Sequence, residues 1–111
     1  MNTRYCLALD IKDNPAAIAA YDEYHKNVWP EIKESISNAG IHAMDIYRTG
    51  NRLFMIMEVD EGFSFEKKAA MDRANPKVKE WEDLMWTFLQ PLPHAQGEKN
   101  WILMDRVFSL K

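Results

Sequence analysis

Two Asn-Pro pairs, Asn14-Pro15 and Asn75-Pro76, restrict the possible folds of this chain more than any other feature. An asparagine before a helix accepts a hydrogen bond from a free N–H of the first turn, and proline suits the first helical position. Each pair therefore predicts the start of a helix, over about residues 15–27 and 76–89.

Two shorter helical segments are predicted beside these helices. The first covers residues 30–38, where Ile32 and Ile36 are four residues apart and therefore share a face. Gly40 follows it, and glycine is the usual residue in the left-handed conformation that ends a helix. The second covers residues 63–73.

Short apolar runs between the helices predict four strands. The runs are Tyr5–Ile11, Ile41–Thr49, Leu53–Val59 and Trp101–Phe108. Gly50-Asn51 forms a tight turn, so the two middle strands make a hairpin. The order β-α-β-β-α-β predicts an α+β, ferredoxin-like fold, with a four-stranded antiparallel sheet and helices on one of its faces.

One face of such a sheet is left without helices. The strand over residues 53–59 is apolar on both sides, which predicts that this face packs against a second copy in a homodimer, a dimeric α+β barrel. The alternative is that the C-terminal tail covers the face.

Chain length and net charge restrict the possible functions. The 111 residues predict one domain over residues 1–111, too small to enclose a large cavity, so a buried site is easier to build at a subunit boundary. The net charge is −3 and no basic run occurs, which argues against nucleic acid as a partner. No apolar run approaches the length of a membrane span. The single cysteine, Cys6, cannot form an intramolecular disulfide, which fits a reducing, cytoplasmic location.

The strongest chemical signal is the stretch Y-x-x-x-H-x-x-x-W-P-E, which contains Tyr21, His25 and Trp29. Spacings of four place Tyr21 and His25 on one helix face, and Pro30 interrupts the helix after Trp29. Imidazole titrates near neutral pH, and the two aromatic rings suit a small polyhydroxylated ligand. The alternative is an amphipathic helix edge that packs on the core.

The other candidates for catalytic or metal-binding residues have weaker sequence signals. His42, on a predicted strand, and His94, in a loop, have no metal-ligand spacing to each other or to His25. Cys6 lies within a strand, and no phosphate-binding or nucleophile motif occurs. The acidic residues around Trp81 are interpreted as a solvated helix face. His25 is therefore the one general acid/base candidate, which favours proton transfer with no metal and no cofactor.

The chain resembles the L-rhamnose mutarotases over nearly its whole length. The resemblance is carried by the Tyr-His-Trp-Pro-Glu stretch and by the segments I-x-x-x-x-x-N-A-G, A-M-D-I-Y-R, L-F-M-I-M-E-V, N-P-K-V-K-E-W-E-D-L-M and W-I-L-M-D-R-V-F. It implies a small cytoplasmic dimer of ferredoxin-like subunits that interconverts the α and β anomers of a free 6-deoxy sugar without metal or coenzyme.

The resemblance also implies roles for single residues. The catalytic histidine of the family, its proton donor, falls on His25, and its sugar-binding tyrosine falls on Tyr21. A tryptophan that lines the sugar pocket falls on Trp81. Trp29 is kept as a further candidate for substrate binding because of its place in the aromatic stretch, where it is also expected to brace the helix of His25.

Two positions depart from the family pattern. Glu82 stands where the rhamnose enzymes can carry a second tryptophan. Met44 stands where they can carry a sugar-contacting tyrosine, although Tyr47 is nearby on the other strand face and is a further candidate for sugar binding. The departures leave L-rhamnose and L-fucose both open as substrates.

Anomerisation requires a proton donor and a proton acceptor. His25 is expected to protonate the ring oxygen, and Tyr21, a carboxylate or a water is expected to take the hydroxyl proton. Two other interpretations remain from the fold and the residues: a cofactor-free monooxygenase or lactone isomerase of the dimeric ferredoxin-like type, and a non-catalytic module that binds a small ligand.

Overall fold

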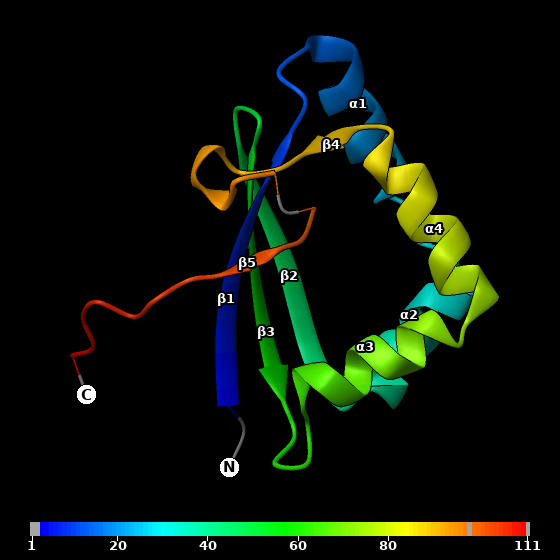
Figure 1. The fold of residues 1–111 in the computed structure, drawn as a ribbon, viewed down its shortest axis with the longest axis vertical. Helices are drawn as coiled ribbons and strands as arrows, with labels where there is room; N and C mark the ends of the chain where they lie inside the picture. The colour runs from blue at the N-terminus through cyan, green and yellow to red at the C-terminus, as the bar shows by residue number, and fades with distance from the viewer. Residues whose placement is uncertain (1–2, 98, 111) are drawn as a thin grey trace.

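An antiparallel sheet forms one layer of the molecule and four α-helices cover one of its faces (Figure 1). The computed structural model describes residues 3–97 and 99–110. The strands are β1 (Thr3–Ile11), β2 (Ile41–Thr49), β3 (Arg52–Val59), β4 (Leu89–Gln90) and β5 (Ile102–Leu103). The helices are α1 (Pro15–Tyr24), α2 (Pro30–Asn38), α3 (Phe65–Arg73) and α4 (Pro76–Trp86), with a 3₁₀ turn, η1 (Pro93–Ala95).

The strand order β2-β3-β1-β4, with β5 also paired to β1, confirms the ferredoxin-like arrangement. The hairpin of β2 and β3 is present as predicted, with one irregularity between Ile41 and Ala43. His42 lies at this irregularity, and its Nε2 contacts the carboxylate of Asp60. None of the helices within the described ranges is long and apolar enough to cross a membrane.

Both Asn-Pro pairs start helices as predicted. The Asn14 side chain accepts a hydrogen bond of 2.8 Å from the N–H of Ala17, and the Asn75 side chain accepts one of 3.0 Å from the N–H of Lys77. The helix ends were predicted too late, because α1 ends at Tyr24 and α4 at Trp86. The residues after α4 turn back to pair with β1, and this pairing ends the helix.

The predicted last strand over residues 101–108 is wrong beyond Leu103. Two short strands pair with β1 where one strand was predicted. β4 pairs with the C-terminal end of β1, and β5 pairs Ile102 with Ala8 and Leu103 with Leu7. Over the described residues the sheet therefore has five strands instead of four. The sheet is open in one chain and forms no closed barrel by itself; the predicted barrel is one of a dimer. The N–H of Met104 still donates a hydrogen bond of 2.8 Å to the carbonyl of Cys6 on β1, and the chain leaves the sheet after this residue.

Residues 104–110, which we call the C-terminal arm, run away from the body as an extended segment without helix or strand (Figure 1). The exposed fractions of Val107, Phe108 and Leu110 are 96%, 76% and 89%. Large apolar side chains are seldom left so exposed unless a partner covers them.

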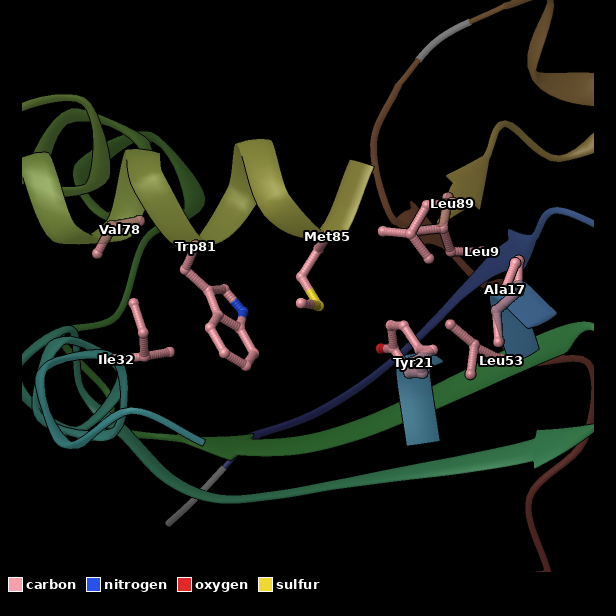
Figure 2. Packing of buried hydrophobic residues seen from close by; sticks show 10 residues of the cluster. Leu9, Ala17, Tyr21, Ile32, Leu53, Val78, Trp81, Met85 and Leu89 are labelled. Carbon is pink, nitrogen blue, oxygen red and sulfur yellow. The ribbon is translucent and has the colours of Figure 1, made fainter. Parts of the chain in front are cut away.

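The main core lies between the sheet and α4. Val78, Trp81 and Met85 project from α4 toward the sheet, where Leu9 and Leu53 are almost fully buried (Figure 2). These three residues are the buried ones of α4, and helical spacing places them on one face. This core forms the floor and one wall of the cleft described next.

Candidate active site

A cleft of about 900 Å³ opens between the helices and the covered face of the sheet. Its volume is in the range of sites that bind small molecules. Side chains of the sheet and of all four helices line it, and they include Tyr21, His25 and Trp81. The cleft therefore contains one titratable imidazole beside two large aromatic rings.

The backbone at the end of α1 orients His25. The carbonyl of Tyr21 lies 2.9 Å from His25 Nδ1 and also accepts the backbone N–H of His25 at 3.2 Å. A carbonyl only accepts, so Nδ1 carries the hydrogen, and Nε2 of the neutral ring keeps a free lone pair. The ring of Tyr21 stacks on that of His25, with 4.1 Å between centroids. The spacing of four residues thus produces the contact that the sequence predicted.

Burial lowers the pKa of His25 below its ordinary value of 6.5, and the Tyr21 carbonyl and the charge of Asp22 oppose this effect only in part. The neutral imidazole is therefore the resting form at pH 7. Arg48 holds the Asp22 carboxylate with two hydrogen bonds of 3.0 and 2.7 Å, which fixes that charge beside the site.

The phenol of Tyr21 is buried, with 4% of the residue exposed. Burial, and after it the charge of Asp22, raise the pKa of Tyr21 far above its usual range. The phenol thus stays protonated at neutral pH, so it can donate a hydrogen bond but is a poor proton acceptor. In Figure 2 its oxygen points toward the space beside Trp81.

Trp81 forms the aromatic wall of the cleft. Its ring meets that of His25 edge to face, with 5.6 Å between centroids. The ring of Trp29 also packs edge to face against Trp81, with 5.0 Å between centroids, and Trp29 is not among the residues that line the cleft. Trp29 therefore supports the ring of Trp81 and does not itself line the space for a ligand.

Tyr47 lies apart from the other predicted site residues. It pairs with Phe54 on β3 and is 58% exposed, whereas its neighbours Met44 and Ile46 on β2 line the cleft. Successive side chains of a strand point to opposite faces, so Tyr47 projects from the face without helices. The structure brings Tyr21, His25 and Trp81 together, and it does not bring Tyr47 to them within one chain.

A polar wall, formed by Lys68, Asp72 and Glu82, also lines the cleft. Lys68 Nζ lies 2.5 Å from Asp72 Oδ2 along α3. Lys68 and Asp72 were not predicted from the sequence, because a Lys–Asp pair four residues apart is common on solvated helices. Glu82 was interpreted as part of a solvated helix face. Its departure from the family pattern was the signal that could have placed it at the site.

Comparisons with known proteins show the family of this chain. A family model described as L-rhamnose mutarotase matches residues 4–110. The L-fucose mutarotase of Xanthomonas campestris pv. campestris is 40% identical over 109 residues, which cover 96% of this chain and 87% of that protein. The L-rhamnose mutarotase of Formosa agariphila is 32% identical over 92 residues, which cover 78% of this chain and 82% of that protein.

A solved structure is also similar in fold. The crystal structure of an L-rhamnose mutarotase from Formosa agariphila superposes with a TM-score of 0.72 at 23% sequence identity. The superposition covers 98% of this chain and 99% of that chain.

Proposed function

Because this chain belongs to the L-rhamnose mutarotase family, we propose that it interconverts the α and β anomers of a free 6-deoxy sugar, L-rhamnose or L-fucose. It is then an aldose mutarotase, an isomerase acting on carbohydrates. The observation that carries the proposal is the neutral imidazole of His25, with Nε2 free, in a cleft beside Trp81.

The reaction needs only proton transfers. When the cyclic hemiacetal opens, the anomeric hydroxyl loses a proton, the bond between the anomeric carbon and the ring oxygen breaks, and the ring oxygen gains a proton. The aldehyde then rotates and the ring closes on its other face. No electron leaves the sugar and no group is transferred to another molecule, so the proposed chemistry requires neither a metal nor a coenzyme.

His25 rests as the neutral imidazole, so we assign its first step as acceptance of the anomeric proton at Nε2. The resulting imidazolium donates the proton when the ring closes. In the opening step His25 is thus a proton acceptor, whereas the family resemblance suggested that it is the proton donor. The high pKa of Tyr21 disfavours that phenol as the proton acceptor. A water or a carboxyl group of the cleft supplies the proton to the ring oxygen.

The aromatic residues hold the sugar. The indole of Trp81 offers an apolar surface for the C–H face and methyl group of a 6-deoxy sugar, and Trp29 keeps that indole in place. The phenol of Tyr21 donates a hydrogen bond to a sugar oxygen. Tyr47 stays a predicted sugar contact, and it fulfils that role only if a second copy presents it to the cleft.

Saturation-transfer NMR of anomer exchange tests the function. The protein is expected to accelerate exchange between the anomers of L-rhamnose or L-fucose above the uncatalysed rate. A sugar that binds without faster exchange would support the ligand-binding alternative instead. Oxygen uptake with a quinol substrate would support the monooxygenase alternative, and either result would reject the mutarotase.

The pH profile tests the resting form of His25. Its pKa lies below 6.5, so the catalysed rate is expected to be level from about pH 7 upward. Below the lowered pKa the rate is expected to fall about tenfold per pH unit, because protonation removes the lone pair of Nε2. Exchange rates are measured at matched ionic strength after subtracting the uncatalysed rate. A catalysed rate that rises on acidification would instead make the imidazolium the resting catalyst.

We also propose that single-domain subunits form a homodimer through the sheet face that lacks helices and through the C-terminal arm. Three apolar residues of the arm are strongly exposed, and Tyr47 on the open face is 58% exposed. Mutual burial of these surfaces removes them from water and stabilises the pair. A cytoplasmic location fits the free thiol of Cys6.

A further inference from the structure

We propose that the polar wall (Lys68, Asp72 and Glu82) recognises the hydroxyl group at C4 of the sugar and selects the axial orientation found in L-fucose. This inference rests on the proposed function, because it assigns the substrate preference of the same cleft.

The ion pair of the wall is withdrawn from solvent. The side chains of Lys68 and Asp72 are 25% and 16% exposed. The corresponding pair on the outer face of α4, Lys79–Asp83, has exposed fractions of 73% and 68%. Removing a pair of charges from water is unfavourable unless each charge has further polar partners. A hydroxyl group that donates to a carboxylate and accepts from the ammonium is such a partner.

Glu82 lines the same cleft as the ion pair, from the neighbouring helix α4. Burial raises the pKa of Glu82. The charges of Asp72 and Asp83 raise this pKa further, and the charges of Lys68 and Lys79 oppose the increase. Both charges of the ion pair therefore act on Glu82, which lines the same cleft as Lys68 and Asp72. Lys77–Glu80, which lies on the same helix as Glu82, is an exposed surface pair. Glu82 is also exposed, but it lines the cleft, whereas Glu80 is not among the lining residues.

The position of the wall relative to His25 indicates which hydroxyl it meets. His25 follows the last turn of α1, and α3 packs near the other end of α4 (Figure 1). When the anomeric carbon lies at His25, the far side of the six-membered ring, with C3 and C4, extends toward α3. The hydroxyl at C4 is therefore the closest candidate for the wall.

The indole of Trp81 favours one orientation of that hydroxyl. In L-fucose the hydrogens at C3, C4 and C5 share one face of the ring, which makes that face apolar and suited to pack on an indole. The axial hydroxyl at C4 then projects from the opposite face, toward polar groups. In sugars with an equatorial hydroxyl at C4 these hydrogens alternate between the two faces.

Three sugars distinguish recognition at C4 from recognition at C2. 6-Deoxy-L-glucose differs from L-fucose only at C4 and from L-rhamnose only at C2. The protein is expected to exchange L-fucose faster than 6-deoxy-L-glucose. In Glu82→Gln this C4 preference is expected to fall about tenfold or more, because one charge-assisted hydrogen bond is lost. The rate ratio of L-rhamnose to 6-deoxy-L-glucose is expected to stay within about twofold, because Glu82 does not meet C2.

Glu80→Gln is the matched control, since it makes the same change on the exposed face of the same helix. It is expected to leave both rate ratios unchanged. Affinities of Glu82→Gln and the wild type for L-fucose and 6-deoxy-L-glucose, followed by tryptophan fluorescence, give a second readout that does not depend on catalysis.

Equal rates for L-fucose and 6-deoxy-L-glucose in the wild type would overturn the proposal, and so would an equal loss on all three sugars in Glu82→Gln. If the wild type accelerates no exchange, the proposed function fails, and the affinity ratio for the two C4 epimers still decides the role of the wall. An affinity ratio unchanged by Glu82→Gln would then reject the role of the polar wall in recognising C4.

Discussion

His25→Ala is expected to lose about 10²–10⁴-fold of the catalysed anomer exchange, the usual contribution of a positioned general acid or base. The loss follows from removal of the one titratable imidazole of the cleft. The fold is expected to persist, because the carbonyl of Tyr21 still accepts the backbone N–H of residue 25. Saturation-transfer NMR on L-rhamnose and L-fucose measures the exchange, and circular dichroism measures the fold.

Two further variants sharpen this result. His25→Gln keeps a polar side chain of similar reach but does not titrate near neutral pH, so it is expected to be as inactive as His25→Ala. His94→Ala removes a histidine in η1, outside the residues that line the cleft, and is expected to match the wild type. Exchange that stays at the wild-type rate in a folded His25→Ala would remove this residue from the mechanism.

A chain shortened to end at Leu103 is expected to lose the dimer. Fully burying a large apolar side chain contributes roughly 1.5–3 kcal/mol, and the truncation removes Val107, Phe108 and Leu110 from each subunit. The dissociation constant is therefore expected to rise by roughly a thousandfold or more. Sedimentation equilibrium over a range of concentrations measures this change directly.

Substitutions in the full chain separate the arm's apolar contacts from its length. Val107→Asp together with Phe108→Asp is expected to weaken the dimer as the truncation does, because each change would bury a charge. Asp105→Asn, in the same arm, is the matched control and is expected to leave the dimer intact. A wild type that sediments as a monomer, or a truncated chain that stays dimeric, would contradict the proposed interface.

Features that depend on neighbouring residues were predictable from the sequence. The starts of α1 and α4 follow from Asn14 and Asn75, whose side chains bond to N–H groups only two or three residues away. The contact of Tyr21 with His25 follows from helical geometry, which places residues four apart on one face. The family resemblance added Trp81 to this pair, and the cleft contains all three.

Features that depend on distant partners were not predictable in this way. The last strand stops at Leu103, and its place is shared with β4, whose pairing with β1 comes from a segment predicted to be helical. Tyr47 was selected for its chemistry, and the alternation of β2 places it on the other face of the sheet. Lys68 and Asp72 match an ordinary surface pair in their spacing, and only the packing of α3 brings them to the cleft.

The sequence by itself therefore determined the order of the elements, the helix starts and the aromatic pair at His25, because short-range hydrogen bonds and helical spacing decide them. The tertiary structure alone decided the protonation state of His25, the polar wall opposite it and the exposed arm. Burial and electrostatic environment are sums over residues far apart in the chain, and they have values only after the chain has folded.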